Sequence, residues 1–286
     1  MLSRSAGCRV GHMAALQQAG DRRESKFGVH STEQDPQFGL VDVLHVTGPL
    51  ATAESEREIR VRVGAFARIP PSIVAPVHRV DRDGDSLRII SAPVDGIRFS
   101  ELLDQLARRK VTIADHGILD LISRAIASLA ALHKCDPAVA HGAIAAEHLV
   151  LTGDGVVFTD AVFAGALGAL QWPSERVWNT FRVALPNGGS FDQRSDVTQL
   201  AVVLLSIALR RPLRVDEYPR SAVTLVMHAT ETLAARSAVR MWLQQALQLH
   251  ARAPFTSAVD AARGFVDLLV GAAGQRAANR VLRTSA

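Results

Sequence analysis

The chain has 286 residues, of which 48% are hydrophobic and 21% are charged, and its formal net charge is +4. This length suits one large domain or two lobes, and the composition excludes disorder over the whole chain. The longest apolar run, residues 200–209, is far shorter than the roughly 20 residues that cross a bilayer. We therefore expect a globular protein that does not span a membrane.

The cysteines and basic residues exclude further classes of protein. Cys8 and Cys135 are the only cysteines and have no CxxC spacing, so neither a disulfide framework nor a zinc site is expected. Residues 1–20 lack the apolar core of a secretion signal, which favours the cytoplasm. The arginines are spread along the chain without interleaved aromatic residues, and we expect no nucleic-acid binding.

The first third of the chain predicts a small β-rich unit with one helix. Residues 1–24 show no sustained period and are predicted to form a flexible N-terminal arm. Residues 40–46 are β-prone, and residues 51–68 are typical of a helix rich in Glu and Arg. Two further strands, at 73–80 and 86–90, are joined by the turn Asp83-Gly84-Asp85. We assign residues 25–94 to this first lobe.

From residue 95 onward the pattern is mainly helical. Apolar residues within 114–133 recur at spacings of 3, 4 and 7, which predicts a helix with one buried stripe. The other expected helices cover residues 99–109, a segment starting at Ser195, and residues 221–234, 239–249 and 257–270. These elements predict a second lobe over residues 95–272 and a tail over residues 273–286.

Two short strands and a long loop interrupt the helices of this second lobe. The strands flank the turn Gly153-Asp154-Gly155, and a loop of some thirty residues, 164–194, follows them. A loop of this length in a compact domain usually has a function. It contains Trp172 and Trp178, for which packing against the second lobe and docking of a partner are both open.

Three segments of the second lobe carry a family resemblance. Residues 141–151 read H-G-A-I-A-A-E-H-L-V-L, residues 159–162 read T-D-A-V, and Ser195-Asp196-Val197 precedes an apolar helix that Asp196 could cap. The three resemble H-R-D-L-K-P-E-N-I-L-L, D-F-G and S-D-V of protein kinases, the bacterial Ser/Thr type in particular. The resemblance covers roughly residues 25–270 and implies an α+β, bilobal protein-kinase-like fold.

The resemblance also implies that the groups needed for phosphoryl transfer are missing. Ala143 takes the place of the catalytic Asp, and Leu44 takes the place of the Lys that binds the phosphates. Ala145 and His148 replace the catalytic-loop Lys and the Asn that holds a magnesium ion. No side chain is therefore predicted to be catalytic, and no metal site is expected.

A few positions of the family pattern survive. Asp160, Glu58 (or Glu56) and Gly28 are the remnants of a cofactor site, although Arg23 and Ser25 fall where two other loop glycines belong. His141 and Asp196 are predicted to be structural, because Asp196 in the family bonds the catalytic-loop backbone near His141.

The resulting hypothesis is a catalytically inactive kinase-like domain, a pseudokinase, that acts as a protein-binding or regulatory scaffold. In the family resemblance, Leu185-Pro186-Asn187 takes the place of the Ala-Pro-Glu that closes the activation segment. Protein partners are expected to contact this altered activation segment and the Arg-rich helix near Glu58. No cofactor is expected, with residual weak affinity for ATP and magnesium left open, as is the oligomeric state.

Three alternatives remain open at this point. An active but atypical kinase would use Asp160 with Glu147 or His148 as its base. Small-molecule phosphotransferases share an H-G-D loop, but Ala143 replaces its aspartate. A purely structural domain would have no stoichiometric partner.

Overall fold

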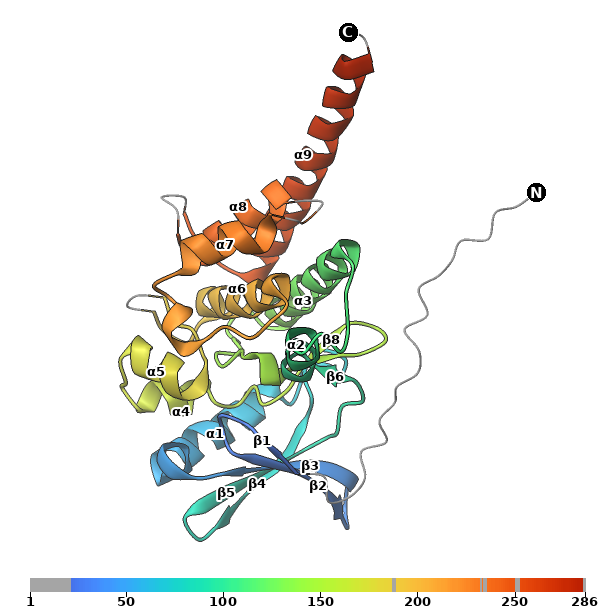
Figure 1. The fold of residues 1–286 in the computed structure, drawn as a ribbon. Coiled ribbons are helices and arrows are strands. Elements are labelled where there is room, and N and C mark those ends of the chain that lie inside the picture. The colour runs from blue at the N-terminus through green and yellow to red at the C-terminus, as the bar shows by residue number, and fades with distance from the viewer. Residues whose placement is uncertain (1–21, 187–188, 232, 234–235, 250–252, 285–286) are drawn as a thin grey trace, which may run out of the picture.

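The computed structural model describes residues 22–186, 189–231, 233, 236–249 and 253–284, with side chains to residue 271. The described chain forms two lobes, a β-sheet lobe with one α-helix and a larger, mainly helical lobe (Figure 1). The α+β, bilobal architecture predicted from the sequence is confirmed.

The first lobe is built on a five-stranded antiparallel sheet with the strand order β1-β2-β3-β5-β4. Its strands are β1 (Arg22–Glu24), β2 (Val29–Asp35), β3 (Gly39–Val46), β4 (Val77–Asp83) and β5 (Ser86–Ser91). Helix α1 (Ala53–Phe66) follows the short 3-10 turn η1 (Gly48–Ala51), and the Thr52 side chain caps it by accepting a hydrogen bond from the Ser55 amide.

The predicted boundaries of the first lobe need two corrections. Strand β1 pairs with β2, so the lobe starts at Arg22 and not at residue 25; residues 1–21 of the predicted arm lie outside the described residues. Strand β4 starts at Val77 and not at residue 73. The segment before it turns at Pro70 and Pro71, and the strand that residue 74 joins there is β8 of the other lobe.

The second lobe contains a small sheet and most of the helices. Strands β6 (Ile97–Arg98), β7 (Leu149–Leu151) and β8 (Val156–Phe158) form a three-stranded antiparallel sheet. The described helices are α2 (Phe99–Ala107), α3 (Asp115–Cys135), α4 (Ala164–Ala169), α5 (Ser174–Phe181), α6 (Gln193–Leu209), α7 (Ala222–Thr230), α8 (Arg236–Ala246) and α9 (Ala258–Thr284), with 3-10 turns η2 (Ala146–His148) and η3 (Val215–Glu217).

Helix α6 is the centre of the second lobe. All of its residues from Ser195 to Ala208 are buried, as expected for a helix that is apolar around most of its circumference. Helices α3, α7, α8 and α9 pack around it. This core anchors the segment between α3 and β7, which carries His141.

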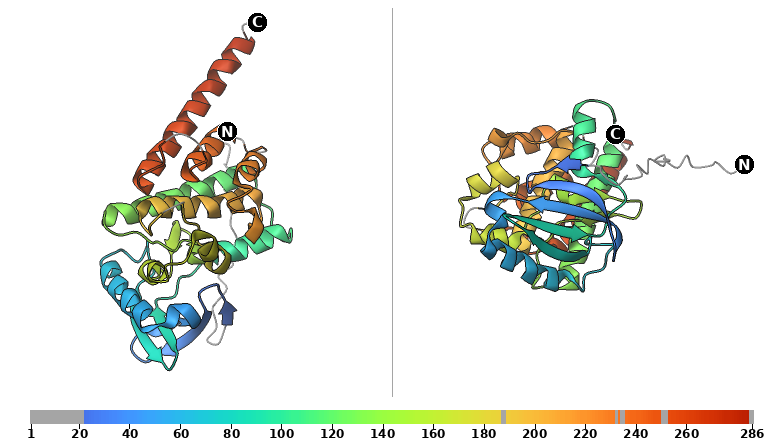
Figure 2. Two further views of the ribbon diagram at one scale, coloured as in Figure 1. Left: turned by 90° about the vertical axis from the view of Figure 1, so that its left-hand side faces the viewer. Right: turned by 90° about the horizontal axis from the view of Figure 1, so that it is seen from below.

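One expectation for the second lobe is wrong. The predicted loop 164–194 contains helices α4 and α5; Ala and Gly dominate the short α4, which gives it no readable apolar period. Residues 273–284 of the predicted tail extend helix α9, and the end of this helix projects away from the lobe (Figure 2).

None of the helices in the described part of the chain is both long and apolar enough to cross a membrane.

Candidate functional site: the cleft between the lobes

The floor of the cleft is organised by Asp196, in the first turn of α6. Its buried carboxylate accepts hydrogen bonds from the backbone amides of His141 and Gly142, each at 2.6 Å. This is the contact with the His141 backbone that the family resemblance implies for Asp196. Its predicted role as the helix cap is wrong, because α6 starts two residues earlier and Asp192 caps it.

Two buried histidines complete the floor. The Ala258 amide donates to His133 Nδ1 at 2.9 Å, so His133 Nε2 carries the proton and donates to Asp196 at 3.0 Å. By the same reasoning, Ala143 N–H donates to His141 Nδ1, and His141 Nε2 donates to the Thr159 carbonyl at 3.0 Å. Burial lowers the pKa of His141 to about 4, so the ring is neutral at pH 7.

Asp160 follows β8, on the second-lobe side of the cleft. Its backbone is left-handed, with φ of 58°, and its side chain accepts a hydrogen bond from Thr159 Oγ1 at 2.9 Å. Burial by itself would raise the pKa of this carboxyl, but His30, His148 and Arg98 nearby lower the pKa to about 2. Asp160 is therefore an ionised carboxylate inside the protein.

Polar side chains of the first lobe and of the connection between the lobes close over Asp160. Arg98 in β6 donates to Asp42 Oδ2 at 3.0 Å, to Thr159 Oγ1 at 3.1 Å and to the Glu147 carbonyl at 2.9 Å. His30 Nδ1 lies 3.3 Å from Asp42 Oδ1, and His30 Nε2 lies 4.0 Å from Asp160 Oδ2. Arg98 and His30 thus connect Asp42 of β3 to Thr159 and Asp160 of the second lobe.

An aromatic residue from the loop between β1 and β2 occupies the centre of the cleft. The Phe27 ring lies 4.6 Å from the ring of His148, 4.7 Å from Phe163 and 5.1 Å from Phe181, measured between centroids. The amide of the preceding residue, Lys26, donates to Glu147 Oε1 at 3.0 Å. The loop is therefore fastened to the second lobe by both packing and a hydrogen bond.

Leu44 of the first lobe and Ala143 of the second lobe make the cleft apolar from both sides. Both belong to one buried cluster with Phe27, Ile59 of α1 and Phe163. Leu44 is 2% exposed and Ala143 is 0% exposed. An apolar cluster therefore surrounds Leu44, which takes the place of the phosphate-binding Lys in the family resemblance.

Two of the predicted remnants have other roles in the structure. A Cβ atom on Gly28, whose φ is +152°, would lie 2.0 Å from the His45 carbonyl oxygen, so the approach of β3 alone requires glycine there. Glu58 lies against α4, where a Cβ on Gly165 would be 2.6 Å from its Oε2. Glu56 pairs with Arg60 and Arg82 instead.

Helix α1 is held to the floor by Arg62, which the sequence gave no reason to single out. Its guanidinium donates to the backbone carbonyls of Ala140, His141 and Ala161. Burial lowers the pKa of this arginine, but the carbonyl oxygens satisfy its donors. The contact fixes the first lobe against the loop that carries Ala143.

The structure thus brings together most of the predicted site residues: His141, Ala143, Asp160, Asp196 and Leu44. The residues that sequence reasoning missed are those that fill the cleft: Phe27, His30, Asp42, Arg62 and Arg98. One signal was readable, since Asp42 is a charged residue in the middle of the β-prone run L-V-D-V-L.

The two tryptophans of the activation-segment region pack against the second lobe. Trp178 is buried and donates from Nε1 to the Val215 carbonyl. Trp172 is half-buried, stacks on Phe181 and lies under the guanidinium of Arg176 at 3.8 Å.

No protein-family model matches the sequence, and no curated protein matches it. Solved structures do match the fold. The kinase domain of Mycobacterium tuberculosis PknI, in a single-mutant form, aligns with a TM-score of 0.58 at 17% identity, over 86% of this chain and 92% of that one. A double mutant of the same domain gives a TM-score of 0.59 at 17% identity, over 88% and 94%.

A plant kinase domain gives a similar result. The kinase domain of maize SIRK1, a sucrose-induced receptor kinase solved with AMP-PNP bound, aligns with a TM-score of 0.64 at 14% identity, over 94% of this chain and 98% of that one. The chain has a protein-kinase fold. This kinase-like chain therefore shares its two-lobed fold with these kinase domains.

Proposed function

We propose that this kinase-like chain is catalytically inactive, a pseudokinase, and that it works as a protein-binding or regulatory scaffold. It needs no nucleotide or metal to hold its lobes together. Its bacterial signalling role and cytoplasmic location are parts of the same proposal.

The observation that carries the proposal is that other side chains of the same chain bury the cleft residues. Phe27 and His30 are each 3% exposed, His148 is 0% exposed and Asp160 is 5% exposed. An open nucleotide cleft would leave such side chains in contact with solvent until a ligand covered them. Here other protein atoms cover them, so a nucleotide would first have to displace Phe27 and separate Arg98 from Asp42.

The chemistry of the cleft supports the same conclusion. Phosphoryl transfer needs an oriented hydroxyl, bound phosphates and metal ions that neutralise developing charge. The methyl group of Ala143 cannot accept a proton, and the side chain of Leu44 cannot neutralise a phosphate. The carboxylate of Asp160 accepts a hydrogen bond from the Thr159 hydroxyl, and Arg98 donates to the same hydroxyl.

The alternative of an active atypical kinase has less support. Glu147 accepts hydrogen bonds from the Lys26 amide, and His148 Nδ1 lies 2.5 Å from the Ala143 carbonyl, to which it donates. Both candidate bases are thus engaged in holding the closed cleft. Ala143 also weakens the alternative of a small-molecule phosphotransferase, because it replaces the aspartate of the H-G-D loop.

Incubation of the full chain with radiolabelled ATP, magnesium and general protein substrates tests the proposal. We expect no labelled product and no autophosphorylation under conditions in which an active Ser/Thr kinase domain labels both. Stoichiometric labelling that is lost in the Asp160→Asn variant would establish the alternative instead.

A further inference from the structure

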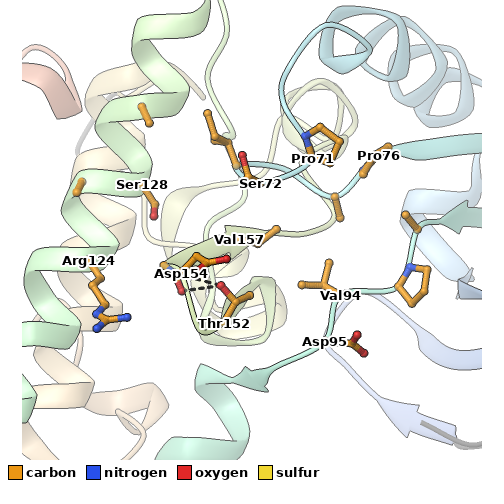
Figure 3. A pocket seen from close by; sticks show the side chains of 17 residues that line it. Pro71, Ser72, Pro76, Val94, Asp95, Arg124, Ser128, Thr152, Asp154 and Val157 are labelled. Carbon is orange, nitrogen blue, oxygen red and sulfur yellow. Dashed lines mark hydrogen bonds between the residues drawn. The ribbon is translucent and has the colours of Figure 1, made fainter. Parts of the chain in front are cut away.

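A pocket that is separate from the filled cleft opens on the other side of the connection between the lobes (Figure 3). Its volume is about 790 Å³, within the range of ligand-binding pockets. The first lobe and the connection provide the wall from residues 71–76 and 92–95, and the second lobe provides α3 and the β7–β8 turn.

The interior of this pocket is apolar and lined by small side chains. The aliphatic and proline residues that line it are Pro71, Ile73, Ala75, Pro76, Ala92, Pro93, Val94, Ala127, Ala131 and Val157. Short side chains on all walls leave room for the longer aliphatic side chains of a ligand. Apolar surface that is covered on binding contributes roughly 25 cal/mol per Å².

The mouth of the pocket is acidic, although the whole chain is basic. Asp95 and Asp154 are exposed, and neither forms a hydrogen bond or an ion pair within the part of the chain that the structure describes. The one cation that lines the pocket, Arg124, already donates to Asp120 Oδ2 at 2.8 Å and to the Gly153 carbonyl. The free charges at the mouth are therefore two carboxylates on a chain whose net charge is +4.

We propose that this pocket binds a short, extended segment of a partner protein in which aliphatic side chains stand next to Lys or Arg. The aliphatic side chains would enter the apolar interior, and the cation would reach Asp95 and Asp154 at the mouth. Anionic partners, including nucleic acid, are disfavoured by the same two carboxylates. The inference deepens the scaffold function proposed above and rests on it.

The placement of the pocket also gives the bound segment an effect on the lobes. Its walls come from both lobes, so a ligand that contacts both holds them in one relative orientation. One wall, Val157, lies in β8, whose Phe158 amide and carbonyl pair with Ile73 and Ala75 of the first lobe. Asp160 of the cleft floor is only two residues past this strand.

The experiment selects peptides from a random phage-displayed heptapeptide library on the immobilised full chain and measures binding of the enriched peptides by fluorescence anisotropy. We expect a consensus with Lys or Arg beside aliphatic residues. Asp95→Asn with Asp154→Asn should weaken these peptides at least ~10-fold, a loss of about 1.4 kcal/mol. Higher salt should also weaken them, because the carboxylates are exposed.

Two further variants keep the result unambiguous. Ala127→Trp, on the exposed side of α3, should block the pocket and abolish binding without disturbing the core. Asp83→Asn with Asp85→Asn changes the net charge equally at the β4–β5 turn and should leave binding unchanged.

Three outcomes would overturn the proposal. The first is the absence of any consensus, and the second is a consensus without cations whose binding survives both the mouth variants and Ala127→Trp. The third is self-association of the chain that Ala127→Trp abolishes, which would assign the pocket to a second copy. The peptide experiment contains no ATP. Its outcome is therefore independent of the labelled-ATP assay, which alone tests whether the chain is inactive.

Discussion

The floor of the cleft, formed by the second lobe, and its roof, formed by the first lobe, are held by different kinds of contact. On the floor, Asp196 holds the backbone of His141 and Gly142, and His133 and His141 are placed by hydrogen bonds at both ring nitrogens. On the roof, Leu44 and Asp42 in β3 contribute an apolar contact and an ion pair with Arg98.

The difference separates polar from apolar stabilisation. The floor satisfies buried backbone amides, and a buried donor that loses its acceptor destabilises the fold. The roof is stabilised instead by apolar side chains that pack against each other. Phe27, Leu44 and Ile59 do so in one apolar cluster.

The largest effect is expected from a change in the floor. Asp196→Ala removes the acceptor of two backbone amides and of His133, and should lower the free energy of unfolding by about 5 kcal/mol. Urea unfolding followed by circular dichroism measures this. The matched control Asp216→Ala, at an exposed carboxylate, should change little, and an equally mild effect of Asp196→Ala would contradict the structural role of the floor.

Restoring the lysine of the roof should destabilise the chain and not revive it. Leu44→Lys places an ammonium in a buried apolar cluster whose α1 neighbour is Ile59, so the free energy of unfolding should fall by about 4 kcal/mol. Leu44→Met, which keeps the volume, should cost less than about 1.5 kcal/mol. A Lys variant as stable as the parent would show that the roof still accommodates a phosphate-binding cation.

A substitution at Phe27 removes the aromatic ring that fills the cleft. Phe27→Ala leaves a cavity among His148, Phe163 and Phe181 and should cost about 3 kcal/mol, the low end for a buried Phe because the residue lies on a loop. Hydrogen exchange should speed up at the amides of residues 25–28. Phe38→Ala, at a partly buried ring of the same lobe, is the control and should leave this loop protected. Unchanged exchange in Phe27→Ala would mean that the ring does not hold the loop.

His141 is expected to make the stability of the floor depend on pH. Burial lowers the pKa of His141 from its ordinary value of 6.5 to about 4, so between these values the unfolded state binds the proton and the folded state does not. Stability should therefore fall as the pH drops from 6.5 toward 4, by up to about 1.4 kcal/mol per pH unit. His141→Gln should flatten the profile in this window. An equally steep profile in that variant would assign the proton to another group.

The sequence predicted the floor better than the roof, and the reason lies in sequence distance. His141, Ala143 and Asp160 belong to two short motifs with fixed spacing, and the helices of the second lobe follow from local apolar periods. The contacts that close the cleft join residues far apart, since Lys26 and Glu147 are separated by 121 positions and Asp42 and Arg98 by 56. No local pattern reports such pairs.

The same reasoning explains the other misassigned segments. Gly28 was interpreted as a remnant of a phosphate-binding loop, whereas the approach of the His45 carbonyl in the neighbouring strand requires it. Helices α4 and α5 lie within a segment that shows no long apolar period and gain their burial from α1 and from the second lobe.

Calorimetric titration of the full chain with ATP and magnesium tests the central claim most directly. Because His30 and Arg98 lie beside the buried Asp160 and Phe27 packs on His148, we predict no saturable heat at ATP concentrations up to about 1 mM, which corresponds to binding weaker than about −4 kcal/mol. Micromolar binding of ATP with magnesium would contradict a cleft that the protein fills with its own side chains.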